Sequence, residues 1–426
     1  MFHKIKKASF VGALGLFTAL SVASPVVPLE AREAVAEINL ATKGVGPIAQ
    51  YRIVALTYLG NNVILASYDG RPDGGDSPSP NSILQRRSTD NGATWSEPTF
   101  IAQGQIKNST ALQYGFSDPS YIYDRETGKV FNFHVFSKDQ GFRGGVLGND
   151  DSNRNVVSSE VSVSTDKGLT WSTDPSNQPN LPPVAAGAIG APPLITKAVK
   201  PNGSTVNGIA NVGGVKAMFA ASGEGIQLRY GSKAGRLVQQ FTGSVVQSDG
   251  SITNQAYSVY SDNGGDTWQM GKPIGKGMDE NKVVELSNGT LMVNSRPGDG
   301  SQHRIITLSN DGGETYGTPR METQLPDPAN NGAITRAYPD AAQGSAEAKV
   351  LLFTNANSKS ARVNGTIRYS CDDGNTWSSG KVFRSATMSY STITAIGDGK
   401  FGLFFEAANN DLQFVALTKE WIGISC

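Results

Sequence analysis

Three arginines stand in short apolar runs of the kind that form β-strands: Arg52 in YRIVAL, Arg296 in LMVNSRPG and Arg368 in GTIRYS. A guanidinium buried among apolar side chains needs a partner, because an uncompensated charge is costly where the dielectric constant is low. Taken singly, each arginine is explained by a structural ion pair or by a place at a strand edge. Taken together, three arginines that converge would bind an anion, and their forked donors suit a carboxylate.

Three carboxylates and one tyrosine stand in stretches that could supply acid–base or nucleophilic groups. Asp76 lies in RPDGGDSPSPNS, Asp118 in YGFSDPSY, Glu280 in GMDENKVVEL and Tyr390 in TMSYSTIT. Each also has a structural explanation, because such carboxylates cap turns or stay solvated and a tyrosine in a strand is an ordinary packing residue. Their residue types alone do not decide between the two explanations.

Histidine and cysteine chemistry is largely excluded. The chain has three histidines, and only His134 and His303 lie beyond its N-terminal segment. A three-histidine zinc site is therefore impossible and a Ser-His-Asp triad is disfavoured. His134 falls in the alternating run KVFNFHVF, which predicts a packed strand residue. If the protein is an enzyme, its acids and bases should be carboxylates or tyrosine.

Composition indicates a large exported globular protein. Among 426 residues, 37 basic side chains balance 37 acidic ones, so nothing points to a nucleic acid partner. The N-terminus MFHKIKK and the apolar run that follows it predict a signal peptide over residues 1–23, cleaved near Ala23. The apolar run is too short for a membrane anchor, and no second one follows. We therefore expect a secreted, extracellular protein with no membrane span.

The chain has two cysteines, Cys371 and Cys426, so its fold cannot depend on a framework of disulfides. One bridge between the C-terminus and the segment around residue 371 would form in an oxidising setting. The sequence leaves this bridge and two free thiols as alternatives. A redox role has no CxxC motif to support it.

A short motif of the form Ser-x-Asp-x-Gly-x-Thr-aromatic occurs five times. Its copies begin at Ser88, Ser164, Ser261, Ser309 and Ser370. Asn263 replaces the aspartate of the third copy, and Tyr316 replaces the tryptophan of the fourth. The polar side chains can hydrogen-bond nearby backbone groups, and glycine supplies a positive φ. The motif thus predicts a rigid hairpin turn, with the aromatic filling the gap between neighbouring strands.

These repeats and the short alternating runs between them predict an all-β protein, specifically a six-bladed β-propeller with one blade lacking the motif. We assign residues 45–426 to the propeller and residues 24–44 to an N-terminal leader segment, with a weak helix candidate over residues 28–40. The repeats should lie on the outer rim and carry no catalysis. They also occur in propellers that are not enzymes.

From about Gln50 to Cys426 the sequence resembles bacterial sialidases (exo-α-neuraminidases), particularly secreted actinobacterial ones. The resemblance is carried by YRIVAL, SYDGRPDGGDSPSPNSILQRRSTDNGATW, GFSDPSYIYDRETG, MDENKVVELSNG, NSR, GTIRYSCDDGNTW and MSYST, in the family's order. Val54 replaces a proline of the family's first arginine motif, a change that a strand tolerates. Little likeness is found between Trp171 and Ala220.

The resemblance implies a role for each candidate residue. Tyr390 matches the nucleophile, Glu280 the glutamate that activates it, and Asp76 the acid/base on a loop. Three arginines match the clamp for the carboxylate of sialic acid, namely Arg52, Arg296 and Arg368. Asp118 matches an aspartate on the N-acetyl side of the pocket, and Glu406 matches the glutamate that holds the first arginine.

The activity implied is release of terminal α-linked sialic acid from glycoproteins, glycolipids or oligosaccharides, with retention through a covalent tyrosyl–sialyl intermediate. It requires no metal and no organic cofactor, and we expect a monomer. Two alternatives stay open. A non-catalytic propeller that binds sialoglycans would have a broken catalytic set with an intact arginine clamp, and an enzyme that performs trans-sialylation or forms an anhydro-sugar would use the same residues.

Overall fold

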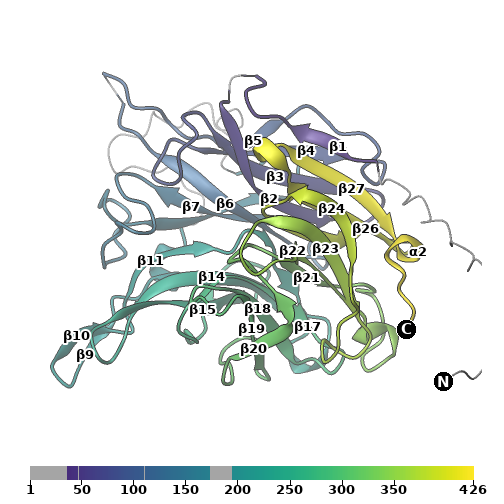
Figure 1. Ribbon diagram of the computed structural model, residues 1–426. Helices are drawn as coiled ribbons and strands as arrows, with labels where there is room; N and C mark the ends of the chain where they lie inside the picture. Colours follow the sequence, from purple (N-terminus) through teal and green to yellow (C-terminus); the bar gives the residue numbers. More distant parts are fainter. Residues whose placement is uncertain (1–35, 47, 110, 173–193) are drawn as a thin grey trace, which may run out of the picture. The chain divides into compact units, whose positions relative to one another are not determined.

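The computed structural model describes residues 36–46, 48–109, 111–172 and 194–426 (Figure 1). Within these ranges, six sheets of four or five strands and one two-stranded hairpin are present. Pairing inside the sheets is antiparallel, apart from one short parallel pair in the second sheet. The expectation of an all-β, six-bladed β-propeller is confirmed.

The first three blades lie in chain order. Blade 1 consists of β2 (Gln50–Tyr58), β3 (Ile64–Arg71), β4 (Ser82–Ser88) and β5 (Thr99–Ala102). Blade 2 consists of β6 (Gly115–Tyr123), β7 (Val130–Ser137) and β8 (Ser158–Ser164), with β12 (Gly223–Glu224) beside β6. Blade 3 consists of β11 (Val215–Ala220), β14 (Leu237–Val246), β15 (Ile252–Ser261) and β16 (Gln269–Met270), with β13 (Ile226–Gln227) beside β14.

The other three blades follow the same order. Blade 4 consists of β17 (Met278–Glu285), β18 (Leu291–Pro297), β19 (His303–Ser309) and β20 (Arg320–Pro326). Blade 5 consists of β21 (Ala333–Arg336), β22 (Leu351–Ala356), β23 (Val363–Ser370) and β24 (Lys381–Thr387). Blade 6 consists of β25 (Ser391–Ala395), β26 (Lys400–Glu406), β27 (Leu412–Thr418) and β1 (Ile38–Ala41).

The remaining described elements are small. The separate hairpin pairs β9 (Ser204–Val206) with β10 (Ile209–Val212). Helices are limited to single turns at α1 (Thr196–Val199) and α2 (Lys419–Ile422) and to 3₁₀ turns at Gly231–Lys233, Glu347–Lys349 and Ala408–Asn410. None of the helices in the described ranges is long and apolar enough to cross a membrane.

The ring closes where the two ends of the described chain meet. The innermost strands β2 and β25 of the first and last blades contact each other. The N-terminal strand β1 (purple) pairs with β27 (yellow) as the outermost strand of blade 6 (Figure 1). β1 lies inside the segment that sequence analysis assigned to a leader, and it is a strand where part of a helix was expected. The predicted signal peptide, residues 1–23, lies outside the described residues. So does the rest of the predicted helix, residues 28–35.

In blades 1, 3, 4 and 5 the repeat forms the turn between the third and fourth strands, and in blade 2 it follows β8, the last described strand of that blade; blade 6 has no repeat. In the first copy, Asp90 accepts hydrogen bonds from Ser88 Oγ (2.8 Å) and from the Thr94 backbone N–H (2.9 Å). In the third copy, Asn263 Oδ1 accepts from the Thr267 backbone N–H (3.0 Å) and Nδ2 donates to the Thr267 hydroxyl (2.9 Å). The amide therefore replaces the carboxylate without loss of the turn.

The repeats also join neighbouring blades, a contact that sequence analysis did not specify. Trp268 of blade 3 packs edge-on against Phe133 of blade 2, with ring centroids 4.8 Å apart. Trp95 of blade 1 packs in the same way against Phe414 of blade 6, at 5.0 Å. In these two copies the ring contacts the preceding blade, whereas Trp377 of the fifth copy contacts Phe353 within its own blade, with centroids 5.9 Å apart.

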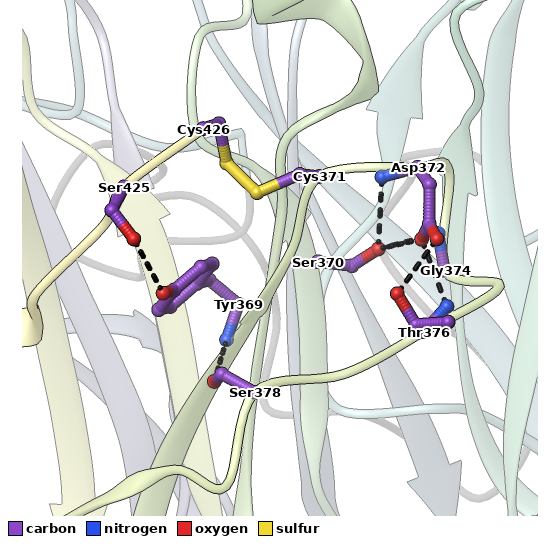
Figure 2. Close-up of a disulfide and its surroundings, with 9 residues drawn as sticks. All are labelled: Tyr369, Ser370, Cys371, Asp372, Gly374, Thr376, Ser378, Ser425 and Cys426. Atoms are coloured by element: carbon purple, nitrogen blue, oxygen red, sulfur yellow. Dashed lines mark hydrogen bonds between the residues drawn. A yellow bond between two sulfur atoms is a disulfide. The ribbon is translucent and has the colours of Figure 1, made fainter.

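The two cysteines form a disulfide, Cys371–Cys426 (Figure 2). Cys371 lies inside the fifth repeat, beside the Ser370–Asp372 hydrogen bond of 2.8 Å. Ser425 and Tyr369 also contact each other through their hydroxyls at 3.1 Å. The bridge and this contact hold the C-terminal residues against blade 5.

The repeat glycines should be the positions where added volume harms the fold most. Gly265 has a φ of +83°, and a Cβ there would lie 2.3 Å from Phe131 Cζ of the preceding blade. We expect Gly265→Ala to lower the free energy of unfolding by about 1–3 kcal/mol through overpacking, beyond the cost of its positive φ. Thermal and denaturant unfolding measure the loss.

Gly128 provides the matched control. Its φ is +76°, and a Cβ there would meet no atom within 4 Å. Gly128→Ala should therefore pay only the backbone cost, roughly 1 kcal/mol. Equal losses in the two variants would contradict a packing role for the repeat glycine.

Candidate active site

The innermost strands of the blades run in the same direction, so residues near their starts gather at one end of the axis. Tyr390 immediately precedes β25, and Glu280 lies near the start of β17. Arg296 lies near the end of β18, which runs antiparallel to β17 and pairs Pro297 with Met278. Three residues that are distant in sequence are thereby brought to one place.

Tyr390, Glu280 and Arg296 form a closed triangle of hydrogen bonds. The Tyr390 hydroxyl donates to Glu280 Oε1 at 2.6 Å. Arg296 Nη1 donates to Glu280 Oε2 at 2.7 Å and to the Tyr390 hydroxyl oxygen at 3.0 Å. Sequence analysis predicted all three residues for one site, and the structure places them in direct contact.

The electrostatics of this triangle set the charge of each member. Burial raises the pKa of Glu280, but the Arg296 guanidinium and the hydrogen bond from Tyr390 outweigh it, so the net pKa is lowered. Burial and the neighbouring Glu280 raise the pKa of Tyr390 well above its ordinary value. At neutral pH the glutamate is therefore a carboxylate and the tyrosine a neutral phenol. The phenolic proton is hydrogen-bonded to a base that could accept it when the tyrosine acts as a nucleophile.

Arg52 is held by Glu406, as the resemblance implied. Arg52 Nη2 donates to Glu406 Oε2 at 2.9 Å and its Nε donates to Oε1 at 3.2 Å. The Ile53 backbone N–H donates to the same carboxylate at 2.7 Å. Glu406 has no exposed surface, and the Arg52 guanidinium lies 5.1 Å from the centroid of the Tyr390 ring. The fork of Arg52 is thus fixed beside the nucleophile.

The structure does not bring Arg368 to this group. Arg368 lies in the middle of β23, the third strand from the axis, where it pairs with Phe353 of β22. Its described hydrogen bond is to Asn357 Oδ1 at 3.1 Å. Burial lowers its pKa, with no neighbouring carboxylate to oppose the effect. The geometry therefore does not support the prediction that Arg368 is a clamp residue.

Arg362 occupies the expected place instead. It directly precedes β23, in the connection from β22 that reaches the same end of the propeller as the start of β25. Its guanidinium lies 5.4 Å from the centroid of the Tyr390 ring, on a par with Arg52. Sequence analysis did not consider Arg362, although it precedes the fifth repeat as Arg368 does.

Asp76 lies on the loop between β3 and β4, and its side chain is 81% exposed. Its carboxylate contacts Arg71 Nη2 at 3.0 Å. Arg71 is itself buried, and its Nη2 contacts Asp69 at 2.9 Å. An exposed carboxylate on a loop, tethered by a buried guanidinium, is free to meet a ligand that enters from solvent.

Asp118 lies in a bulge of β6, with a φ of +63°. Its backbone N–H donates to Asp69 Oδ1 at 3.0 Å. Burial and the carboxylates of Asp69 and Asp76 raise the pKa of Asp118 well above its ordinary value. Asp118 is thus close to the loop that carries Asp76, in surroundings that favour its protonated form.

Sequence analysis missed Asp69 and Arg71 as members of this site. They occupy alternate positions of the fully buried strand β3, so their side chains share one face. Burial raises the pKa of Asp69 to about 6, although Arg71 opposes the rise. Two charges at positions i and i+2 of an otherwise buried strand were the available signal, since such charges must pair.

His134 is confirmed as a packed strand residue. It is fully buried in β7, and its ring nitrogens lie 3.2 Å from Asn132 Oδ1 and 3.3 Å from Glu160 Oε1. Neither neighbour is a member of the site. This histidine belongs to the interior of blade 2.

A cavity of about 620 Å³ opens at the other end of the innermost strands. Thr57 near the end of β2, Glu224 of β12 and Arg336 at the end of β21 contribute to its lining. Burial raises the pKa of Glu224 to about 7. The triangle of Tyr390, Glu280 and Arg296 does not line this cavity, so the two ends of the axis are chemically distinct.

Fold and site together define a six-bladed propeller with a tyrosine–glutamate pair at its axis. The chain matches the family model of the BNR repeat-like domain over residues 64–403, and it belongs to this family. It is similar to the sialidase of Micromonospora viridifaciens, with 47% identity over 412 residues that cover 97% of this chain and 58% of that protein. It is also similar to the sialidase of Bacteroides fragilis, with 25% identity over 87% of this chain and 62% of that protein.

The chain thus spans about 60% of the length of these curated relatives, 58% and 62% in the two cases. Solved structures show the same fold. A Hadza microbial sialidase has a TM-score of 0.74 at 22% identity, covering 91% of this chain and 69% of its own. The intramolecular trans-sialidase of Ruminococcus gnavus has a TM-score of 0.68 at 18% identity, covering 91% and 98%.

The choice between Arg362 and Arg368 is open to direct test. We expect Arg362→Ala to weaken binding of N-acetylneuraminic acid, a free sugar with a carboxylate, by roughly tenfold or more, because a charge-assisted hydrogen bond is lost. Arg368→Ala, which removes a guanidinium of the same size from the same blade, should leave the affinity unchanged. Titration calorimetry or ligand-observed NMR measures both, and the reverse ranking would restore Arg368.

Proposed function

We propose that the protein is a retaining exo-α-sialidase that removes terminal α-linked sialic acid from glycoproteins, glycolipids and oligosaccharides. The observation that carries the proposal is the 2.6 Å hydrogen bond from the Tyr390 hydroxyl to a buried, ionised Glu280. Similarity to two proteins named sialidase supports the same activity. Together they favour an enzyme over a propeller that only binds sialoglycans.

The chemistry follows from the substrate. The anomeric carbon of sialic acid carries a carboxylate, which would repel a carboxylate nucleophile. A tyrosine is uncharged until its proton leaves, and Glu280 is placed to accept that proton. In the first step, the Tyr390 oxygen bonds to the anomeric carbon, Glu280 takes the phenolic proton, and Asp76 protonates the departing glycosidic oxygen.

The second step reverses these roles. Asp76, now a carboxylate, takes a proton from water, and the water oxygen bonds to the anomeric carbon. The bond to Tyr390 breaks, and Glu280 returns the proton to the phenolic oxygen. Two displacements at one carbon give retention, and the enzyme ends in its starting protonation state.

The arginines place the sugar for this reaction. Arg52, Arg296 and Arg362 all lie against Tyr390, at distances that the site's geometry fixes before substrate enters. We assign them the substrate carboxylate, because forked donors bind it in a defined orientation. Asp118 and Arg71 both contact Asp69, and Arg71 also contacts Asp76 on the acid/base loop.

We also propose that the protein is secreted after cleavage near Ala23. The basic start and apolar run of residues 1–23 support export. The Cys371–Cys426 disulfide fits an oxidising compartment. N-terminal sequencing of protein recovered from culture medium tests this, and intact residue 1 in the medium would contradict it.

Tyr390→Phe should lower kcat for a fluorogenic α-sialoside by roughly a hundredfold or more, because the nucleophile is lost. Phenylalanine keeps the ring and its packing, so the loss of kcat reports the missing hydroxyl. Proton NMR of the wild-type reaction should show the α-anomer of the free sugar first, as retention requires.

Tyr51→Phe is the matched control. Tyr51 packs in the same apolar cluster as Tyr390, but its hydroxyl donates to the Val45 carbonyl, 3.0 Å away. Its loss should leave kcat unchanged. Full turnover by Tyr390→Phe would overturn the mechanism, and binding of the sialoside without turnover by wild type would indicate a lectin-like propeller. An anhydro-sugar product would instead indicate intramolecular transfer.

A further inference from the structure

A lysine lies buried beneath the tyrosine–glutamate pair. Lys282 follows Glu280 by two residues on β17, and only 3% of its surface is exposed. Its Nζ donates to Asn331 Oδ1 at 2.7 Å. Gly223 makes room for it, because a Cβ at that position would lie 2.7 Å from Lys282 Cε. The absence of a side chain at residue 223 therefore leaves room for the buried Lys282 side chain.

Asn331 connects this lysine to the nucleophile. Its side chain accepts from Lys282 and donates to Ser222 Oγ at 2.7 Å, so both ends of its amide are held. Its backbone carbonyl accepts from the N–H of Ser391, the residue directly after Tyr390, at 3.4 Å. Lys282 is thus two hydrogen bonds away from the backbone that presents the tyrosine.

The other side of Tyr390 is held by the neighbouring asparagine. Asn330 Nδ2 donates to the carbonyl of Ser389, directly before the tyrosine. The Asn330 backbone N–H donates to Asp327 at 2.7 Å, and Asp327 is a fully buried partner of Arg304. The segment 327–331 is therefore hydrogen-bonded to the residues directly before and after Tyr390. Each asparagine also accepts a hydrogen bond from a buried basic side chain, Asn330 from Arg304 and Asn331 from Lys282.

We propose that Lys282 is a positioning residue for the sialidase reaction, which acts through Asn331 to hold Tyr390 against Glu280 and whose positive charge adds to that of Arg296 near the Glu280 carboxylate. The inference rests on the proposed function of the same site. Lys282 has no described hydrogen bond to Glu280, so its charge acts on the carboxylate through space. A merely structural lysine would need neither the asparagine that holds the nucleophile's flank nor a place beside its base.

The charge of Lys282 has a defined direction of effect. Burial lowers its pKa to about 7, with Glu280 opposing that fall, so the ammonium form is present below neutral pH. A positive charge stabilises the Glu280 carboxylate and lowers its pKa. The other charged and titratable groups that act on the two residues come from several blades: Arg52, Asp118, Asp279, Arg296, Arg304 and Tyr390.

The test compares two substitutions in the full chain. Lys282→Met keeps the length of the side chain without charge or donor, whereas Lys282→Gln keeps a donor for Asn331 without charge. For Lys282→Met we expect kcat on a fluorogenic α-sialoside to fall on the order of ten- to a hundredfold, with KM little changed, because a misplaced nucleophile slows the chemical step. Lys282→Gln should recover part of kcat.

The pH profile separates charge from packing. The acidic limb of kcat/KM reports the free enzyme's base, and it should move to higher pH in both variants, because Arg296 remains but the second cation that lowers the pKa of Glu280 is gone. Lys138→Met is the matched control, because Lys138 is also buried. Its Nζ donates to Ser158 Oγ at 2.9 Å and to the Asp151 carbonyl at 3.0 Å, both within blade 2 and its β7–β8 loop. It should lose stability without a shift in the limb.

Each outcome bears on a different claim. A shifted acidic limb in both Lys282 variants, absent in Lys138→Met, supports the proposal. If Lys282→Met does not fold, Lys282→Gln carries the test alone through the same shift. Folded variants with unchanged kcat and an unchanged limb would overturn the proposal while leaving the function intact. Loss of wild-type activity in the same assay would contradict the proposed function itself.

Discussion

Glu280 carries its charge in a place where water cannot solvate it, and the architecture of the site follows from that cost. A buried carboxylate needs a cation and hydrogen-bond donors, and Arg296 and Tyr390 supply them at 2.7 and 2.6 Å. The same arrangement sets up the chemistry, because the donor that satisfies the carboxylate is the nucleophile it must deprotonate. The two contacts that stabilise the buried Glu280 carboxylate thus also hold Tyr390 where Glu280 can deprotonate it.

A second buried carboxylate joins the ends of the ring. Glu406 of blade 6 binds the side chain of Arg52 and the backbone of Ile53, both in blade 1. The pairing of β1 with β27 closes the same junction at the outer edge. An arginine that must meet a small anion is therefore anchored at the seam of the propeller, where two independent interactions resist separation of the blades.

The repeats maintain this geometry from a distance. The first and third turns present a glycine without side chain and a large aromatic to the preceding blade, as Gly265 and Trp268 do toward Phe131 and Phe133. Close packing between sheets resists deformation, because protein interiors have low compressibility. The innermost strands, and with them Tyr390 and Glu280, are held in register around the axis although no repeat touches the site.

The sequence by itself determined the all-β class and the six blades, because these depend on local turn chemistry and on motif order along the chain, and its resemblance to sialidases selected Tyr390, Glu280 and Arg52 for one site. Only the tertiary structure decided that Arg362, and not Arg368, lies against Tyr390, that β1 belongs to the last blade, and that Lys282 stands beneath the nucleophile. Such pairings join residues from different blades. Which residues contact each other depends on which strand ends lie together at the axis. The order of residues along the chain does not specify that arrangement.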